Sequence, residues 1–182
     1  MPQPGVPLEF VAADGPVREP VTKVGGQPVW LEEPQWPVSR TTGEPMEFLG
    51  QFALDGGRLA YLFMMGDGDG WTWHPERGDN ALVIQPGGRI PDFVTVRAQA
   101  EGPSAGEDHL PRTAERHSSL FLGGPDTEPE WVQDDEHPGE GWELVVQLTE
   151  ELPFFVNFGD AGAGWAFVSP DGKEGRFLWQ CC

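Results

Sequence analysis

The chain has 182 residues, of which 38% are hydrophobic, and its 30 acidic residues against 11 Lys and Arg give a net charge of −19 at pH 7. The length suits one domain or two small halves, and 8 Trp with 11 Phe predict a packed core rather than disorder. The charge repels phosphate backbones, so direct nucleic-acid binding is excluded. The absence of a long apolar run or a signal-like start predicts a cytoplasmic protein without membrane contact. A monomer is favoured, and the oligomeric state is left open.

Short apolar runs bounded by Gly, Pro, Asp or Asn follow one another along the chain, which is typical of strands and turns. They are found at 46–54, 58–65, 81–85, 93–99, 142–148, 153–159, 164–168 and 175–180. Helical periodicity is never sustained over three turns, and at most a short helix is expected near 111–120. The predicted fold class is mainly β, β-rich α+β at most.

Two of these runs carry more detailed predictions. In 46–54, the apolar residues Met46, Phe48, Phe52 and Leu54 are predicted to share one face of a strand. The run 58–65 is almost continuously apolar, which predicts a strand that is buried on both faces.

The same series of motifs occurs on both sides of a polar stretch at residues 100–115. The first series is Gly25-Gly26, Trp30, Trp36-Pro37, Gln51 and GDGDGW at 66–71; the second is Gly123-Gly124, Trp131, His137-Pro138, Gln147 and GDAGAGW at 159–165. This order predicts an internal duplication: two tandem β units packed with pseudo-twofold symmetry as one compact domain. The predicted boundaries are an N-terminal tail 1–21, a first unit 22–98, a linker 99–117 and a second unit 118–182.

The repeated residues are expected to be structural. Each Gly pair would form the turn at the start of a unit, and Gln51 and Gln147 would satisfy backbone groups. The full set of structural motif residues is Gly25, Gly26, Pro28, Trp30, Gln51, Gly123, Gly124, Trp131, Gln147 and Asp160. The last motif also pairs Trp71 with Trp165 and Asp67 with Asp160.

The loop KVGGQPVW, followed by LEEPQWP, contains two tryptophans with different expected roles. Trp30 has a counterpart in Trp131, so we expect it to be buried as an anchor. Trp36 is matched by His137, so we expect it to be partly exposed and to contact a partner. The candidate partner-binding residues are Trp36, Trp73 and Trp142, because exposed aromatic rings beside charge are favoured at interfaces.

The blocks GGQPVW, WP, TGEPMEFLGQF and YLFMM, together with the tail FGDAGAGWAFVSPDGKEGRFLWQC, resemble the YwqG-like family of bacterial proteins. That family is grouped with the programmed-cell-death-protein-2 relatives as the TYPP superfamily, and the resemblance covers roughly residues 22–85 and 153–181. The bacterial branch has no established reaction, so the resemblance implies no particular activity. The eukaryotic branch acts as a carrier for a newly made ribosomal protein. Ser39 and Thr42 stand where that branch has a Cys pair, so the resemblance implies no zinc knuckle here.

Motifs for catalysis or metal binding are incomplete. GPSAG at 102–106 matches a nucleophile elbow around Ser104, but the elbow needs a helix that EDHLPR does not favour. Asp67 and Asp160 would be a carboxylate pair if the repeats face each other. Cys181 and Cys182 are adjacent, which would strain a disulfide between them, so free thiols are expected. No cofactor and no metal are expected.

These observations predict a non-enzymatic protein-binding module, chaperone-like or an adaptor, whose acidic surface takes a basic protein or peptide. One alternative is an immunity protein that neutralises a cationic toxin. A second alternative is a hydrolase using Ser104 or the Asp67/Asp160 pair.

Overall fold

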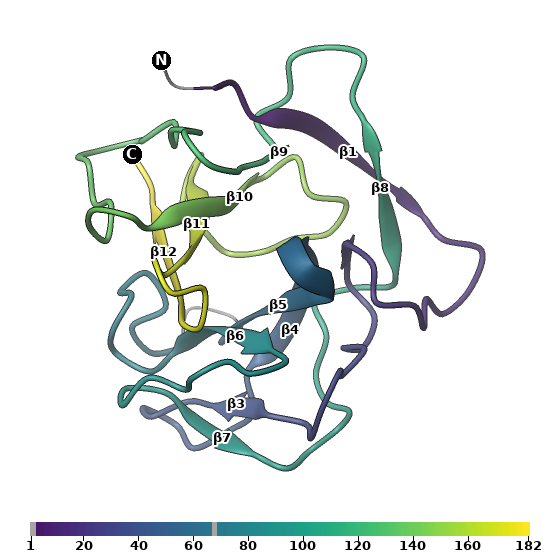
Figure 1. The fold of residues 1–182 in the computed structure, drawn as a ribbon, viewed down its shortest axis with the longest axis vertical. Helices are drawn as coiled ribbons and strands as arrows, with labels where there is room; N and C mark the ends of the chain where they lie inside the picture. The colour runs from purple at the N-terminus through teal and green to yellow at the C-terminus, as the bar shows by residue number, and fades with distance from the viewer. Residues whose placement is uncertain (1–2, 67–68) are drawn as a thin grey trace.

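The computed structural model describes residues 3–66 and 69–182, and within them the fold is mainly β, as predicted (Figure 1). The strands are β1 (Val6–Ala12), β2 (Lys23–Val24), β3 (Trp36–Val38), β4 (Glu47–Leu54), β5 (Arg58–Met64), β6 (Asn80–Gln85), β7 (Thr95–Arg97), β8 (His109–Thr113), β9 (Phe121–Leu122), β10 (Glu143–Thr149), β11 (Ala163–Val168) and β12 (Gly175–Gln180). A single 3-10 turn, η1 (Asp55–Gly57), is the only helical element in these residues, so 111–120 contains no helix. No helix in the same ranges is long and apolar enough to cross a membrane.

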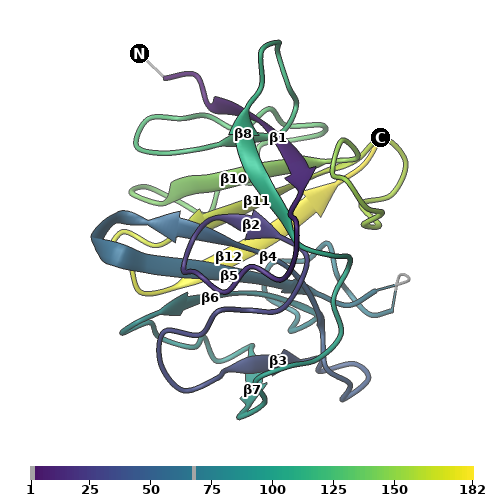
Figure 2. The ribbon, with the colours of Figure 1, turned by 90° about the vertical axis from the view of Figure 1, so that its right-hand side faces the viewer.

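Ten of the strands form one curved sheet in the order β12-β11-β10-β9-β1-β8-β2-β4-β5-β6. The two end strands, β6 and β12, pack against each other, which makes the sheet a nearly closed, barrel-like structure (Figure 2). Gly175 permits this approach, because a Cβ at that position would lie 2.4 Å from the Leu82 carbonyl oxygen. The last strand of the chain therefore packs against β6, the last strand that the first half contributes to the sheet.

The sheet order reads the same from either end. One half contributes β2-β4-β5-β6 and the other β9-β10-β11-β12, with antiparallel pairing between all neighbours in each set. Between them, β1 pairs with β9 and β8 pairs with β2, so the strand that precedes each half joins the other half. The two sets of four strands therefore have the same order, and the duplication stays a prediction.

The expected tail 1–21 and linker 99–117 each contain a strand, β1 and β8, which sequence patterns did not indicate. β8 has the sequence HLPRT, in which a central Pro and polar neighbours hide the strand signal. The Pro is tolerated because β8 meets β2 at one position only, Val24 opposite His109, which leaves Pro111 outside that ladder.

Strand β5 is buried on both faces, as its continuous apolar run predicts. Ala60 and Leu62 face the core inside the barrel, whereas Tyr61 and Phe63 face a second cluster outside it. The outer cluster is covered by the two-stranded sheet β3–β7, which lies at the bottom of the view in Figure 1. A third cluster, around Trp165, lies on the outer face of the second half.

The prediction that Met46, Phe48, Phe52 and Leu54 share one face was wrong. Met46 and Phe48 pack in the outer cluster, but Phe52 and Leu54 pack in the barrel core. A bulge between Phe48 and Gly50 shifts the register of β4, and the extra residue moves the following side chains to the other face. Strand β10 has a bulge at the matching position, between Leu144 and Val146.

Candidate functional site

Two buried glutamines, Gln51 and Gln147, bind the loops before Trp30 and Trp131 in the same way. The Gln51 side-chain oxygen accepts from Val29 N at 3.0 Å, and the Gln147 oxygen accepts from Glu130 N at 2.8 Å. Each amide nitrogen then donates to the carbonyl of the residue two positions before its partner strand, β2 or β9. Both side chains therefore satisfy backbone groups of the loop that carries a motif tryptophan.

Gln85 and Gln180, at the ends of β6 and β12, make a second matching pair that the sequence did not reveal. The Gln85 oxygen accepts from Leu31 N at 3.1 Å, and the Gln180 oxygen accepts from Val132 N at 3.1 Å. A terminal Gln in a strand carries no pattern of its own, so only the geometry shows the correspondence.

The ring contacts of the motif tryptophans correct one predicted equivalence. Trp30 lies 4.8 Å from Tyr61 between ring centroids, and Trp131 lies 4.7 Å from Trp165. Tyr61 on β5 therefore corresponds to Trp165 on β11, and each is paired in register with the glutamine of its half. Trp71 lies outside β5, between β5 and β6, so its predicted match with Trp165 was wrong.

The expected exposures of Trp30 and Trp36 are reversed. Trp36 is 0% exposed and donates from Nε1 to Met46 O at 2.9 Å, while Trp30 is only half-buried. Trp36 is buried because β3 carries it beneath the outer face of β5, where its ring lies 5.1 Å from that of Phe63. A buried ring cannot contact a partner, so Trp36 is not a binding residue. Its counterpart His137 is exposed.

Gly25 and Gly26 follow β2, and Gly123 and Gly124 follow β9. Gly25 has φ +76°, and a Cβ there would lie 2.0 Å from Glu107 O, so both its conformation and its close packing require glycine.

Among the described residues, those predicted to act in catalysis do not form a site. Ser104 donates to Gly106 O at 2.9 Å, and strand β8 rather than a helix follows it. Asp160 is exposed, and Asp67 lies outside the described residues. Cys181 and Cys182 are free thiols. Within 3–66 and 69–182, no group of three or more His, Cys, Asp or Glu is arranged to hold a metal ion.

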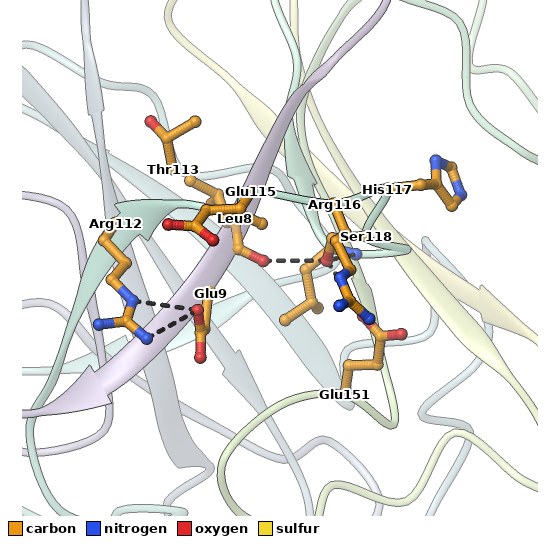
Figure 3. A pocket seen from close by; sticks show the side chains of 11 residues that line it. Leu8, Glu9, Arg112, Thr113, Glu115, Arg116, His117, Ser118 and Glu151 are labelled. Carbon is orange, nitrogen blue, oxygen red and sulfur yellow. Dashed lines mark hydrogen bonds and ion pairs between the residues drawn. The ribbon is translucent and has the colours of Figure 1, made fainter.

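A cavity of about 480 Å³ lies where β1 and β8 meet the turn before β9 (Figure 3). Ser118 Oγ lies 2.9 Å from Leu8 O and 3.0 Å from Glu151 Oε2, and it accepts from Leu120 N. The His117 ring points away from both Ser118 and Glu151 (Figure 3). The Glu151 carboxylate also accepts from Ser119 N, so Ser118 and Glu151 together cap the backbone N–H groups of this turn, which is a structural role.

A larger cavity of about 750 Å³ lies beside the loop that carries Trp30, between residues 12–18, 26–30 and 100–108. Asp108 connects segments beside this cavity: its carboxylate pairs with buried Lys23 and accepts a hydrogen bond from Val17 N. Ser104 also lines this cavity, but its hydroxyl donates to the Gly106 carbonyl and not to a side-chain base.

The most distinctive surface of the molecule lies between β5 and β6. Trp71 is 45% exposed and Trp73 is 43% exposed, and their ring centroids are 5.2 Å apart. Trp179 of β12 packs against Trp73, with the two ring centroids 6.2 Å apart. We call these three residues the tryptophan surface. Single exposed apolar side chains are ordinary, but adjacent exposed indoles are typical of interaction sites.

The backbone beneath the tryptophan surface is rigidly held. Buried Asp79 accepts from Trp71 N at 2.8 Å, and the buried Asn80 amide donates to Thr72 O at 2.8 Å. Trp179 Nε1 donates to the Thr72 hydroxyl at 3.1 Å. The exposed rings are thus displayed by an ordered segment, which reduces the entropy lost when a partner binds.

Asp79 is the centre of this support. Besides Trp71 N, its carboxylate accepts from the Ser39 and Thr41 hydroxyls, each at 2.6 Å. Burial by itself raises the pKa of Asp79, but these hydrogen bonds to the charged form together outweigh burial and lower the pKa below its ordinary value. The Ser39 hydroxyl thus donates to the Asp79 carboxylate.

Of the three predicted partner-binding residues, Trp73 belongs to the tryptophan surface and Trp36 is buried. Trp142 is half-buried, and the Arg176 guanidinium lies 5.1 Å from its ring centroid. The sequence missed Trp71 and Trp179. The alternation in WTW was the available signal, since Thr72 is buried between two exposed rings.

Neither a scan against protein-family models nor a search of curated proteins finds a match to this chain.

Proposed function

We propose that the chain is a non-enzymatic protein-binding module, chaperone-like or an adaptor, that takes a basic protein segment on the tryptophan surface. We also propose membership of the YwqG-like family, on the motifs given above. The observation that carries the function is the pair of neighbouring, exposed indoles of Trp71 and Trp73, on a hydrogen-bonded backbone, in a protein of net charge −19.

Charge and shape support the same kind of partner. Exposed indoles provide anchor area, and they attract cations over their ring faces. Asp69 and Glu76, both exposed, lie on the same connection as Trp71 and Trp73. Long-range attraction from the acidic protein would draw in a cationic segment, and the indoles would then hold it.

The test is calorimetric titration of the full chain with a peptide that combines Arg, Lys and Gly. We expect binding that weakens as salt is raised, because screening reduces the attraction between the charges. The double variant Trp71→Ala, Trp73→Ala should lose about tenfold or more in affinity. Phe155→Ala is the matched control, since Phe155 is 80% exposed but lies on the connection between β10 and β11. Equal affinities for the double variant and the control would refute the proposal.

A further inference from the structure

One guanidinium of the chain itself already occupies the tryptophan surface. The Arg77 side chain lies over the Trp71 ring, with Cζ 4.7 Å from the ring centroid. Arg77 is exposed, and the ion pairs among the described residues do not include it. The indole face is therefore the partner that the structure gives to this cation.

We propose that the tryptophan surface recognises arginine side chains, and that Arg77 is an internal competitor which covers the Trp71 face until a partner arginine displaces it. This inference rests on the proposed function and adds the chemistry of the ligand and a means of regulation.

Arginine fits this surface better than lysine for physical reasons. A guanidinium is planar, stacks on an aromatic face and is weakly hydrated, whereas an ammonium is compact and strongly hydrated. The donors at the edge of a stacked guanidinium also remain free to bond a carboxylate such as that of Asp69, which is exposed two residues before Trp71. A phosphate-bearing ligand is disfavoured by the negative charge of the protein.

Competition by Arg77 is weak enough to be reversed by binding. A cation over an exposed ring is held loosely, by an amount that corresponds to about a two- to fivefold change in an equilibrium constant. A partner with several arginines overcomes this, because its other residues interact with the remaining surface. Arg77 would then select against weak, single-arginine ligands.

The experiment titrates the full chain with two peptides of equal length and charge, one alternating Arg with Gly and the other Lys with Gly. We expect the Arg peptide to bind the native protein more tightly than the Lys peptide. Arg77→Ala should bind the Arg peptide about two- to fivefold more tightly than the native protein. Arg18→Ala, which removes an exposed arginine from the loop after β1, measures the part of this gain that comes from net charge alone.

The outcomes separate this inference from the proposed function. Equal affinity for the two peptides, or an equal gain in Arg77→Ala and Arg18→Ala, overturns the inference, and the function stands if Trp71→Ala still weakens binding of both. If Trp71→Ala and Trp73→Ala leave binding of both peptides unchanged, the proposed function fails as well. Circular dichroism and the unfolding midpoint of each variant show that the exposed substitutions leave the fold intact.

Discussion

Replacing Asp79 by asparagine tests the support of the tryptophan surface. Asp79→Asn keeps the shape of the side chain but turns one carboxylate oxygen into an NH2 group. The oxygen Oδ2 accepts from Thr41 Oγ1 and from Trp71 N. The Ser39 and Thr41 hydroxyls can rotate to accept from the new NH2. Either orientation of the amide, however, leaves one backbone N–H facing a donor: that of Trp71 if NH2 replaces Oδ2, or that of Thr41 if it replaces Oδ1.

The expected loss follows from these contacts. Removing a hydrogen bond to a buried charged group costs about 1.5–3 kcal/mol of unfolding free energy. For a chain of this length, that lowers Tm by about 3–12 °C. Urea unfolding at neutral pH, followed by tryptophan fluorescence, measures the free energy, and exposed Asp14 in Asp14→Asn is the control. The variant should also bind cationic peptides more weakly, because a neutral amide holds Trp71 N less strongly than the carboxylate does.

The pH dependence gives a second, independent check. The pKa of Asp79 is lowered in the folded protein, so the ionised carboxylate stabilises the fold above the ordinary pKa of about 4. That stabilisation is lost as the pH falls below about 4 and through the lowered pKa of the folded state. The deficit of Asp79→Asn relative to the native protein should therefore shrink over this range. A deficit under about 0.5 kcal/mol at neutral pH, or one that stays constant down the acid range, would refute the reasoning.

Three further predictions concern buried side chains of the two halves. Trp36→Ala should cost about 3–5 kcal/mol of unfolding free energy, because it empties a fully buried site, and Trp30→Ala should cost clearly less; equal losses in chemical denaturation would contradict this. Gln51→Leu and Gln147→Leu should each cost about 1–3 kcal/mol, because each leaves buried backbone groups without partners, and a negligible loss in either would show that its contacts are dispensable. Burial raises the pKa of Tyr61, the sole tyrosine, so stability should fall as the pH rises above about 10, and the absorbance of tyrosinate should appear together with unfolding rather than before it.

The sequence predicted what depends on local patterns. Apolar runs between turn residues located β4, β5, β6, β10, β11 and β12, and the continuous run at 58–65 correctly indicated burial on both faces. They missed β1, and the run at 153–159 contains no strand. It did not predict the faces of β4, because a bulge moves side chains without leaving a mark in composition. It placed Trp36 at the surface because the covering sheet β3–β7 joins segments far apart in the chain, and long-range pairing has no local signature.

The shared and unshared parts of the two halves explain where a binding site can arise. The glutamine and tryptophan contacts are the same in both halves, so they account for the fold and not for a function found on one side only. The connections between the last two strands differ: residues 65–79 join β5 to β6, whereas the much shorter 169–174 joins β11 to β12. Because β6 and β12 lie side by side, the long connection of the first half reaches Trp179 of the second. The tryptophan surface therefore lies where the halves differ and where they meet, so comparison of the motifs shared by the halves pointed to the scaffold and away from the residues that we propose for binding.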